Sequence, residues 1–156
     1  MIDFDNELDL VLLPVVAVAL IAGVTIQCFF LRTLAGVLRQ CAPESRAMSP
    51  GLVWLNLIPV VGNVWVFVTV HKISVSLTAE FHRRGLSADK TDFGSGVGFV
   101  YPVLCLLGLV PVVGQLFCVG GLICWGMYWR AMRGYAKTLS ASRAGAKSRT
   151  RRPAFG

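Results

Sequence analysis

Residues 49–65 read SPGLVWLNLIPVVGNVW, and a related segment, YPVLCLLGLVPVVGQLF, follows at residues 101–117. The two copies align without a gap and share eight of 17 positions, including two prolines at the same spacing and the whole Pro-Val-Val-Gly segment. The next position holds a side-chain amide in both copies, Asn63 and Gln115. Leucine matches alone would mean little in so apolar a chain. Two prolines followed by a glycine and an amide indicate an internal repeat.

The Pro-Val-Val-Gly segments predict breaks in helical structure. Proline inside a helix removes a hydrogen bond and clashes with the preceding turn, and the residue before it is pushed out of the helical region. Glycine then permits backbone angles that other residues avoid. Pro59, Gly62, Pro111 and Gly114 are therefore expected at the tips of two helical hairpins, or at two sharp kinks. The earlier prolines of the copies, Pro50 and Pro102, are each expected in the first turn of a helix, where the missing N–H costs nothing.

Three long runs without any charged side chain predict a membrane protein. They cover residues 10–31, 51–70 and 93–129, which is 22, 20 and 37 residues. About 20 apolar residues in a helix span the hydrocarbon core of a bilayer, and these runs show no polar stripe of the kind that a soluble helix carries. The sequence begins with acidic rather than basic residues, so the first run is expected to be a retained helix and not a secretory signal.

Length favours a hairpin for the third run, because a single helix of 37 residues would be about 55 Å long. The expected fold class is all-α, a polytopic helical membrane bundle with two Pro-Val-Val-Gly hairpins from the internal repeat. We expect one transmembrane domain over residues 1–142 and a basic, flexible cytoplasmic tail over 143–156. The expected membrane segments are about 10–31, 50–58 (re-entrant or kinked), 60–82, 95–110 and 112–133.

The net charge of +7 is strongly polarised along the chain. Residues 1–9 carry four acids and no base, whereas eight bases and no acid follow Trp129. Basic residues flanking membrane segments stay cytoplasmic, which predicts a cytoplasmic C-terminus. Four full spans would leave three of the 15 bases, Arg32, Arg39 and Arg46, outside the cell. Two hairpins with an external N-terminus would keep all 15 inside, so the hairpin arrangement is favoured and the side of the N-terminus stays open.

Basic residues after the last apolar run indicate contact with anionic lipid headgroups. Arg130, Arg133 and Lys137 fall at i, i+3 and i+7, on one face of a helix leaving the membrane. No aromatic stacking platform or recognition motif accompanies them, so nucleic acid is not expected as a partner.

The sequence offers no set of residues for catalysis, for a cofactor or for a metal. Its five cysteines include no Cys-x-x-Cys and are interpreted as small packing side chains. His71 and His82 would lie about 16 Å apart along a helix, too far to share a metal. The charge-free runs contain no acid or base for general catalysis, so an enzyme is not expected.

Four amide side chains inside the apolar runs are the remaining candidates for function. Polar groups in lipid usually face the bundle interior, where they form interhelical hydrogen bonds. They could also line a pore or cavity at the hairpin tips, as in transporters with broken helices, although an ionisable residue is usual there. These possible pore or helix-packing residues are Gln27, Asn56, Asn63 and Gln115.

Residues 43–82 resemble a family of small, uncharacterised, multi-spanning bacterial membrane proteins. The resemblance rests on a Pro-Gly pair at 50–51, then Trp54, Asn56, an Ile-Pro pair at 58–59 and Trp65, followed by a polar helix. It implies a bacterial inner-membrane protein and no particular activity. Beside this signature, Glu44 and Arg46 are interpreted either as caps of the re-entrant helix or as solvated loop charges.

These observations favour a non-enzymatic membrane protein that acts by association. It would be an accessory subunit or a self-assembling scaffold, and its partner is expected to be a further copy of the chain or another membrane protein. The alternative is a small oligomeric channel or membrane-perturbing effector with Asn63 and Gln115 near its lumen, and a transporter is the third possibility.

Overall fold

The computed structural model describes residues 4–86, 93–108, 110–111 and 114–150, with side chains from residue 12 onward and at Leu10, and up to residue 146. The described part is helical and contains no strand, which confirms the all-α class. Two of its helices are long and apolar enough to cross a bilayer. The elements in chain order are α1 (Phe4–Gln40), the 3-10 helices η1 (Pro43–Ser45) and η2 (Pro50–Leu57), α2 (Pro59–Arg83), α3 (Ser95–Leu107) and α4 (Gly114–Thr150).

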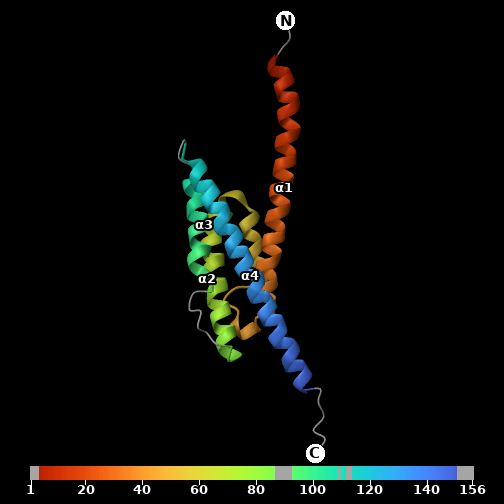
Figure 1. Ribbon diagram of the computed structural model, residues 1–156, viewed down its shortest axis with the longest axis vertical. Helices are drawn as coiled ribbons and strands as arrows, with labels where there is room; N and C mark the ends of the chain where they lie inside the picture. Colours follow the sequence, from red (N-terminus) through yellow and green to blue (C-terminus); the bar gives the residue numbers. More distant parts are fainter. Residues whose placement is uncertain (1–3, 87–92, 109, 112–113, 151–156) are drawn as a thin grey trace, which may run out of the picture.

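The helices lie side by side along one axis, with the two chain ends at opposite ends of the molecule (Figure 1). α1 runs from the N-terminal end toward the middle, η2 returns beside it, and α2 then runs back. α3 and α4 form a second antiparallel pair, and α4 continues to the C-terminal end. The first half of α1 extends beyond both reversals of the chain, so it stands apart from the other helices.

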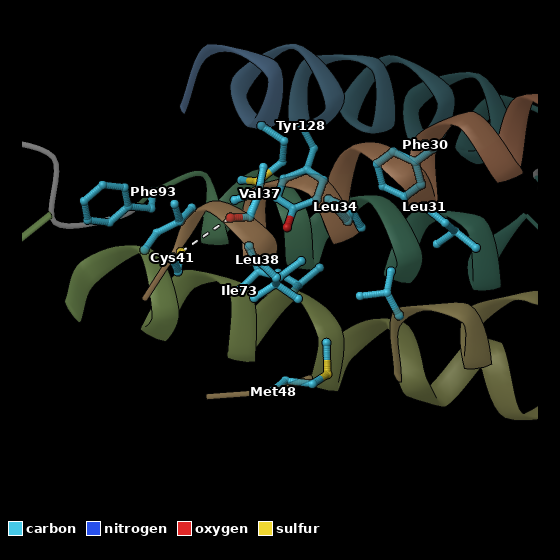
Figure 2. Packing of buried hydrophobic residues seen from close by; sticks show 14 of the residues in the cluster. Phe30, Leu31, Leu34, Val37, Leu38, Cys41, Met48, Ile73, Phe93 and Tyr128 are labelled. Carbon is cyan, nitrogen blue, oxygen red and sulfur yellow. Dashed lines mark hydrogen bonds between the residues drawn. The ribbon is translucent and has the colours of Figure 1, made fainter. Parts of the chain in front are cut away.

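The core lies around the second half of α1. Phe30, Leu34, Val37 and Cys41 recur at three- and four-residue spacing, which places them on one face of the helix, and all are buried. Figure 2 shows how this face packs against side chains from α2 and α4. The partners from those two helices are Val70, Ile73, Leu77, Phe81, Tyr128, Met132 and Leu139.

The first reversal of the chain occurs at Ile58, one residue before the predicted tip. Ile58 is extended (φ −79°, ψ 117°) and α2 begins directly at Pro59, in the first turn of a helix where proline fits without loss. Gly62 is already inside α2 and is not one of the described glycines with positive φ, which are Gly85 and Gly94. A Cβ on Gly62 would collide with the carbonyl oxygen of Asn56. The glycine is therefore needed for close backbone approach, and the expectation of an unusual dihedral was wrong.

The chain between α3 and α4 has the same backbone hydrogen bonds as the turn between η2 and α2. Ile58 N–H donates to Leu55 O at 3.2 Å and Gly62 N–H to Ile58 O at 2.6 Å. In the second copy Val110 N–H donates to Leu107 O at 3.1 Å and Gly114 N–H to Val110 O at 2.9 Å. A Cβ on Gly114 would collide with the carbonyl oxygen of Gly108. Each of these residues in the second turn aligns with its counterpart in the first turn, in the same sequence alignment that pairs residue 49 with residue 101.

Some element boundaries differ from those expected. Pro50 begins η2 as expected, but Pro102 lies inside α3, because the chain enters that helix earlier, through Gly94 at a positive φ of 75°. Pro102 leaves the carbonyl of Gly98 without its helical donor. α4 continues to Thr150, through residues expected to form a flexible tail, since alanine, arginine and lysine in that segment are good helix formers.

Candidate functional site

A cavity lies between the first reversal of the chain and the middle of the other helices. Its volume is about 460 Å³, within the range of roughly 300–1,000 Å³ that is usual for small-molecule sites. Every helix except η1 contributes to its wall. The side chains and backbone that define it include Gly23, Gln27, Asn56, Asn63, Tyr101 and Trp125.

Three of the four amides singled out in the sequence meet at this cavity. Gln27 comes from α1, Asn56 from η2 and Asn63 from the first turns of α2. Gln115, the repeat counterpart of Asn63, is exposed at the start of α4 and does not line the cavity. Among the predicted hairpin residues, Gly62 lies in the cavity wall. Pro59, Pro111 and Gly114 lie at or beside the two chain reversals and outside the cavity.

Asn56 has a structural role that the other two amides lack. Its Nδ2 donates to Val53 O within η2 at 2.7 Å and to Thr69 Oγ1 on α2 at 2.9 Å. The bond to Thr69 joins η2 to α2. Trp65 adds a second link, because its indole Nε1 donates to Leu52 O at 2.8 Å. In hydrocarbon, backbone carbonyls of a short 3-10 helix need such donors. Asn56, Gly62 and Trp65 therefore each have a structural role where η2 packs against α2.

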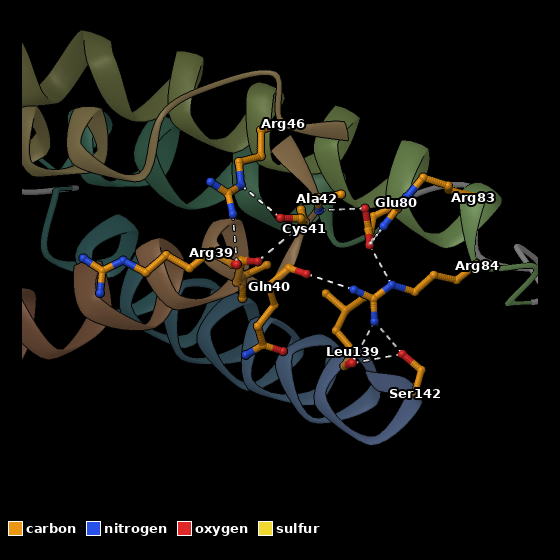
Figure 3. Close-up of polar contacts among 11 residues, drawn as sticks. Arg39, Gln40, Cys41, Ala42, Arg46, Glu80, Arg83, Arg84, Leu139 and Ser142 are labelled. Atoms are coloured by element: carbon orange, nitrogen blue, oxygen red, sulfur yellow. Dashed lines mark hydrogen bonds and ion pairs between the residues drawn. The ribbon is translucent and has the colours of Figure 1, made fainter. Parts of the chain in front are cut away.

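A second polar cluster, not anticipated from the sequence, surrounds Glu80 near the end of α2 (Figure 3). The Glu80 side chain is fully buried. One carboxylate oxygen accepts the backbone N–H of Ala42 at 2.9 Å. The other accepts Arg83 Nη2 at 2.9 Å and Arg84 Nε at 2.6 Å. Burying a carboxylate is costly unless it is paired and hydrogen-bonded, and here both conditions hold.

Arg84 extends the cluster to the two other long helices. Its Nη2 donates to Gln40 O, the last residue of α1, at 2.9 Å. Its Nη1 donates to Leu139 O at 2.8 Å and to Ser142 Oγ at 2.6 Å, both on α4. One guanidinium therefore connects the ends of α1 and α2 to the C-terminal part of α4, and it satisfies a free carbonyl at the end of α1. We call Glu80 with Arg84 the helix-end cluster.

The loop after α1 is held down by neighbouring side chains. Arg46 donates from Nε to Cys41 O at 3.0 Å and from Nη2 to Arg39 O at 3.0 Å. It therefore caps α1, and it is neither of the two alternatives expected from the sequence, a cap of the re-entrant helix or a solvated loop charge. Ser76 Oγ accepts the N–H of Ala47 at 2.9 Å. Burial, reinforced by the nearby Glu80 carboxylate, raises the pKa of the Cys41 thiol to about 11, so this cysteine is an unreactive packing side chain.

Glu80 is not predicted as a site residue from the sequence, because Glu-x-x-Arg-Arg at the end of a helix is the ordinary pattern of solvated i,i+3 and i,i+4 pairs. The available signal was position, since Glu80 falls on the same face as the apolar residues Ile73 and Leu77. The cavity residues Tyr101 and Trp125 were missed because aromatic residues are common in any apolar span.

The basic residues predicted to contact lipid headgroups lie on the exposed surface of α4. Arg130, Arg133 and Lys137 are all exposed, and the guanidinium of Arg133 lies 5.0 Å from the ring centre of Trp129. Trp129 Nε1 donates to Thr33 Oγ1 on α1 at 3.0 Å. A tryptophan with its N–H satisfied and an arginine above its ring is an arrangement that suits the membrane–water interface.

In the part of the chain that the structure describes, no group of three or more His, Cys, Asp or Glu side chains could hold a metal ion. Comparisons with protein-family models, with curated proteins and with solved structures found no match to this chain.

Proposed function

We propose that this chain is a non-enzymatic, multi-pass protein of a bacterial inner membrane and that it acts by associating with other membrane helices. The partner is a second copy of the chain or a different membrane protein. The observation that carries the proposal is the first half of α1, which has the composition of a membrane span and in which none of the described side chains is buried.

Exposure along α1 changes abruptly at its middle. Leu13 and Leu20 are 75% and 64% exposed, whereas Leu34 and Leu38 are buried. The most apolar stretch of α1 has no buried residue at all, while a third of the corresponding stretch of α2 is buried. Lipid tails can cover such a surface, but small residues such as Ala19 allow another helix to approach closely. A free apolar span joined to a rigid bundle is the arrangement of a helix that recruits a partner.

The proposed topology has the N-terminus outside and both hairpins entering from the cytoplasm. The ends of α1, α2 and α4 lie toward the same end of the molecule (Figure 1), and the exposed bases Arg39, Lys72, Arg83 and Arg133 lie in the C-terminal parts of those helices. This distribution satisfies the positive-inside rule. The shared hydrogen bonds of the two chain reversals support their origin in an internal repeat.

Reporter fusions test the topology. A phosphatase and a fluorescent protein, each active on one side of the membrane only, are fused after Met48, after Leu86 and at the C-terminus. Hairpins predict cytoplasmic activity at all three points. External activity after Met48, with cytoplasmic activity at the other two, would replace the first hairpin by a full span and refute the proposed topology.

Association is tested by measuring the mass and composition of the complex extracted from native membranes in a mild detergent. A homo-oligomer of defined size, or a stoichiometric second protein, supports the proposal, and a bare monomer refutes it. Ala19→Leu should weaken the complex if the small-residue face of α1 is the contact. Ala17→Leu is the matched control, because the same change falls on the opposite face of the helix.

A channel is the second candidate, favoured by the meeting of Gln27, Asn56 and Asn63 at one cavity. Gln115 lies outside that cavity, so several copies would be needed to bring Asn63 and Gln115 to one lumen. Ion flux into liposomes that disappears in Asn63→Leu and Gln115→Leu would establish the channel. Absent flux, or flux that both variants retain, would exclude it, and saturable uptake of one solute would instead indicate a transporter.

A further inference from the structure

We propose that the cavity between α1, the first hairpin and the α3–α4 pair binds one uncharged lipid whose head carries hydroxyl and carbonyl groups, as in a diacylglycerol. This inference goes beyond association through α1 and shares with it only the location in a membrane.

The cavity lies within the hydrocarbon part of the chain. All of its lining residues fall inside the three charge-free runs, 10–31, 51–70 and 93–129. No side chain with a formal charge lines it, and a charged ligand would there lack a counter-charge at high cost. The ligand must accordingly be neutral.

The exposed rim of the cavity is mainly apolar. Ile26, Leu106 and Leu122 line the cavity and are 47%, 41% and 63% exposed, and Asn63 is an exposed polar residue beside them. The three apolar side chains open the cavity toward lipid tails. A ligand therefore enters from the bilayer, and an acyl chain is the part that matches the walls.

Amide groups without a protein partner face the cavity. Within the described part of the chain, no hydrogen bond joins the side chain of half-buried Gln27 or of exposed Asn63 to another group, and Asn56, whose Nδ2 is paired, has a buried Oδ1 without a partner. Each amide offers two N–H donors and a carbonyl acceptor, and an amide left unpaired in hydrocarbon is unfavourable. Hydroxyl and carbonyl groups on a neutral head would satisfy both donors and acceptors. Water could do so too, which makes a water-filled cavity the rival occupant.

A larger side chain at a glycine in the cavity wall can fill the cavity. Gly23 lines it, and a Cβ at this position would meet no atom within 4 Å, so Gly23→Leu occupies the space without displacing the backbone. Gly126→Leu is the matched control, because Gly126 also has open space at its Cβ but lies outside the cavity.

The test uses the full-length protein in phosphatidylcholine vesicles with a diacylglycerol that carries a photoreactive group on one acyl chain. We expect labelling that excess unlabelled diacylglycerol competes away and that maps to the cavity walls. Gly23→Leu should reduce it at least tenfold, Gln27→Leu and Asn63→Leu severalfold, and Gly126→Leu should leave it unchanged. Tryptophan fluorescence and the native mass of each variant establish that the fold and any association are intact.

Several results would overturn the proposal. Equal competition by phosphatidylcholine would show contact with bulk lipid only, and full labelling of Gly23→Leu would place the ligand elsewhere. Rapid reaction of Asn63→Cys with a charged, membrane-impermeant thiol reagent would show a water-filled cavity. A negative labelling result with an intact oligomer removes the lipid site while leaving association through α1 standing.

Discussion

Replacing Glu80 by glutamine is the most informative single perturbation of this fold, because the change keeps the side-chain shape and removes only the charge. The carboxylate accepts three hydrogen bonds in a fully buried position. The bond from Arg83 counts for little, since that side chain is 52% exposed and exposed pairs contribute at most about 1 kcal/mol. Arg84 is only 15% exposed, so most of the destabilisation is expected from losing its bond and that of the Ala42 N–H.

Hydrogen bonds to a charged group contribute roughly 1.5–3 kcal/mol each, and breaking a buried pair costs about 3–5 kcal/mol. Glutamine can still accept one of the bonds with its single oxygen, so we expect Glu80→Gln to lose about 3 kcal/mol of unfolding free energy. That is roughly a hundredfold change in the unfolding equilibrium. Arg83→Gln is the control and should cost less than about 1 kcal/mol.

The assay is reversible unfolding in mixed detergent micelles, followed by tryptophan fluorescence. A double-mutant cycle with Arg84→Met separates the pair from general loss of packing. The double variant should cost at least about 1.5 kcal/mol less than the sum of the single variants if the two side chains act together. If Glu80→Gln is no more destabilising than Arg83→Gln, the helix-end cluster does not hold the helices and the reasoning fails.

Three further predictions concern the chain reversals and the buried thiol. Gly62→Ala should lower the unfolding free energy by at least about 2 kcal/mol in the same assay, because the added methyl meets the Asn56 backbone carbonyl, which cannot move aside as a side chain would. Gly36→Ala is the control, since a Cβ there meets nothing within 4 Å. An effect of Gly62→Ala no larger than that of the control would contradict this prediction. Gly114→Ala should show a similar loss for the second reversal, and a neutral result there would mean that the two turns are not equivalent. In a variant whose sole cysteine is Cys41, a maleimide at pH 7 should react with the thiol only when the protein unfolds. The reason is that the thiol is buried and its pKa is raised to about 11. Fast labelling of the native protein would refute the burial of this side chain.

The helical class could be predicted from the sequence because it depends on local pattern. Charge-free runs of sufficient length and the repeated prolines were enough to anticipate helices and to locate the places where they break. The exact turn could not be predicted, since proline is equally compatible with ending one helix and beginning the next. In the structure Pro59 begins α2, and Gly62 serves close approach to Asn56.

The candidate site was harder to predict because its residues meet only through long-range packing. Gln27, Asn56 and Asn63 were recognisable as polar groups in apolar surroundings, but their meeting depends on where α1 passes the first hairpin. The sequence around Glu80 is typical of a surface charge. In the structure, however, the loop after α1 lies against Glu80 and donates the N–H of Ala42 to its carboxylate. Neither relationship leaves a periodic signal in the sequence.

The projection of α1 beyond both chain reversals has a consequence for the shape of the surrounding lipid. On the proposed orientation, a single helix occupies the outer leaflet, whereas α1, the first hairpin and the α3–α4 pair all occupy the cytoplasmic leaflet. The molecule is then wedge-shaped, with a larger lateral area in the cytoplasmic leaflet than in the outer leaflet. A protein of this shape strains the bilayer least where the cytoplasmic leaflet is convex. We expect the protein to be enriched in small inside-out vesicles over large ones, and an even distribution between the two sizes would exclude this preference for curvature.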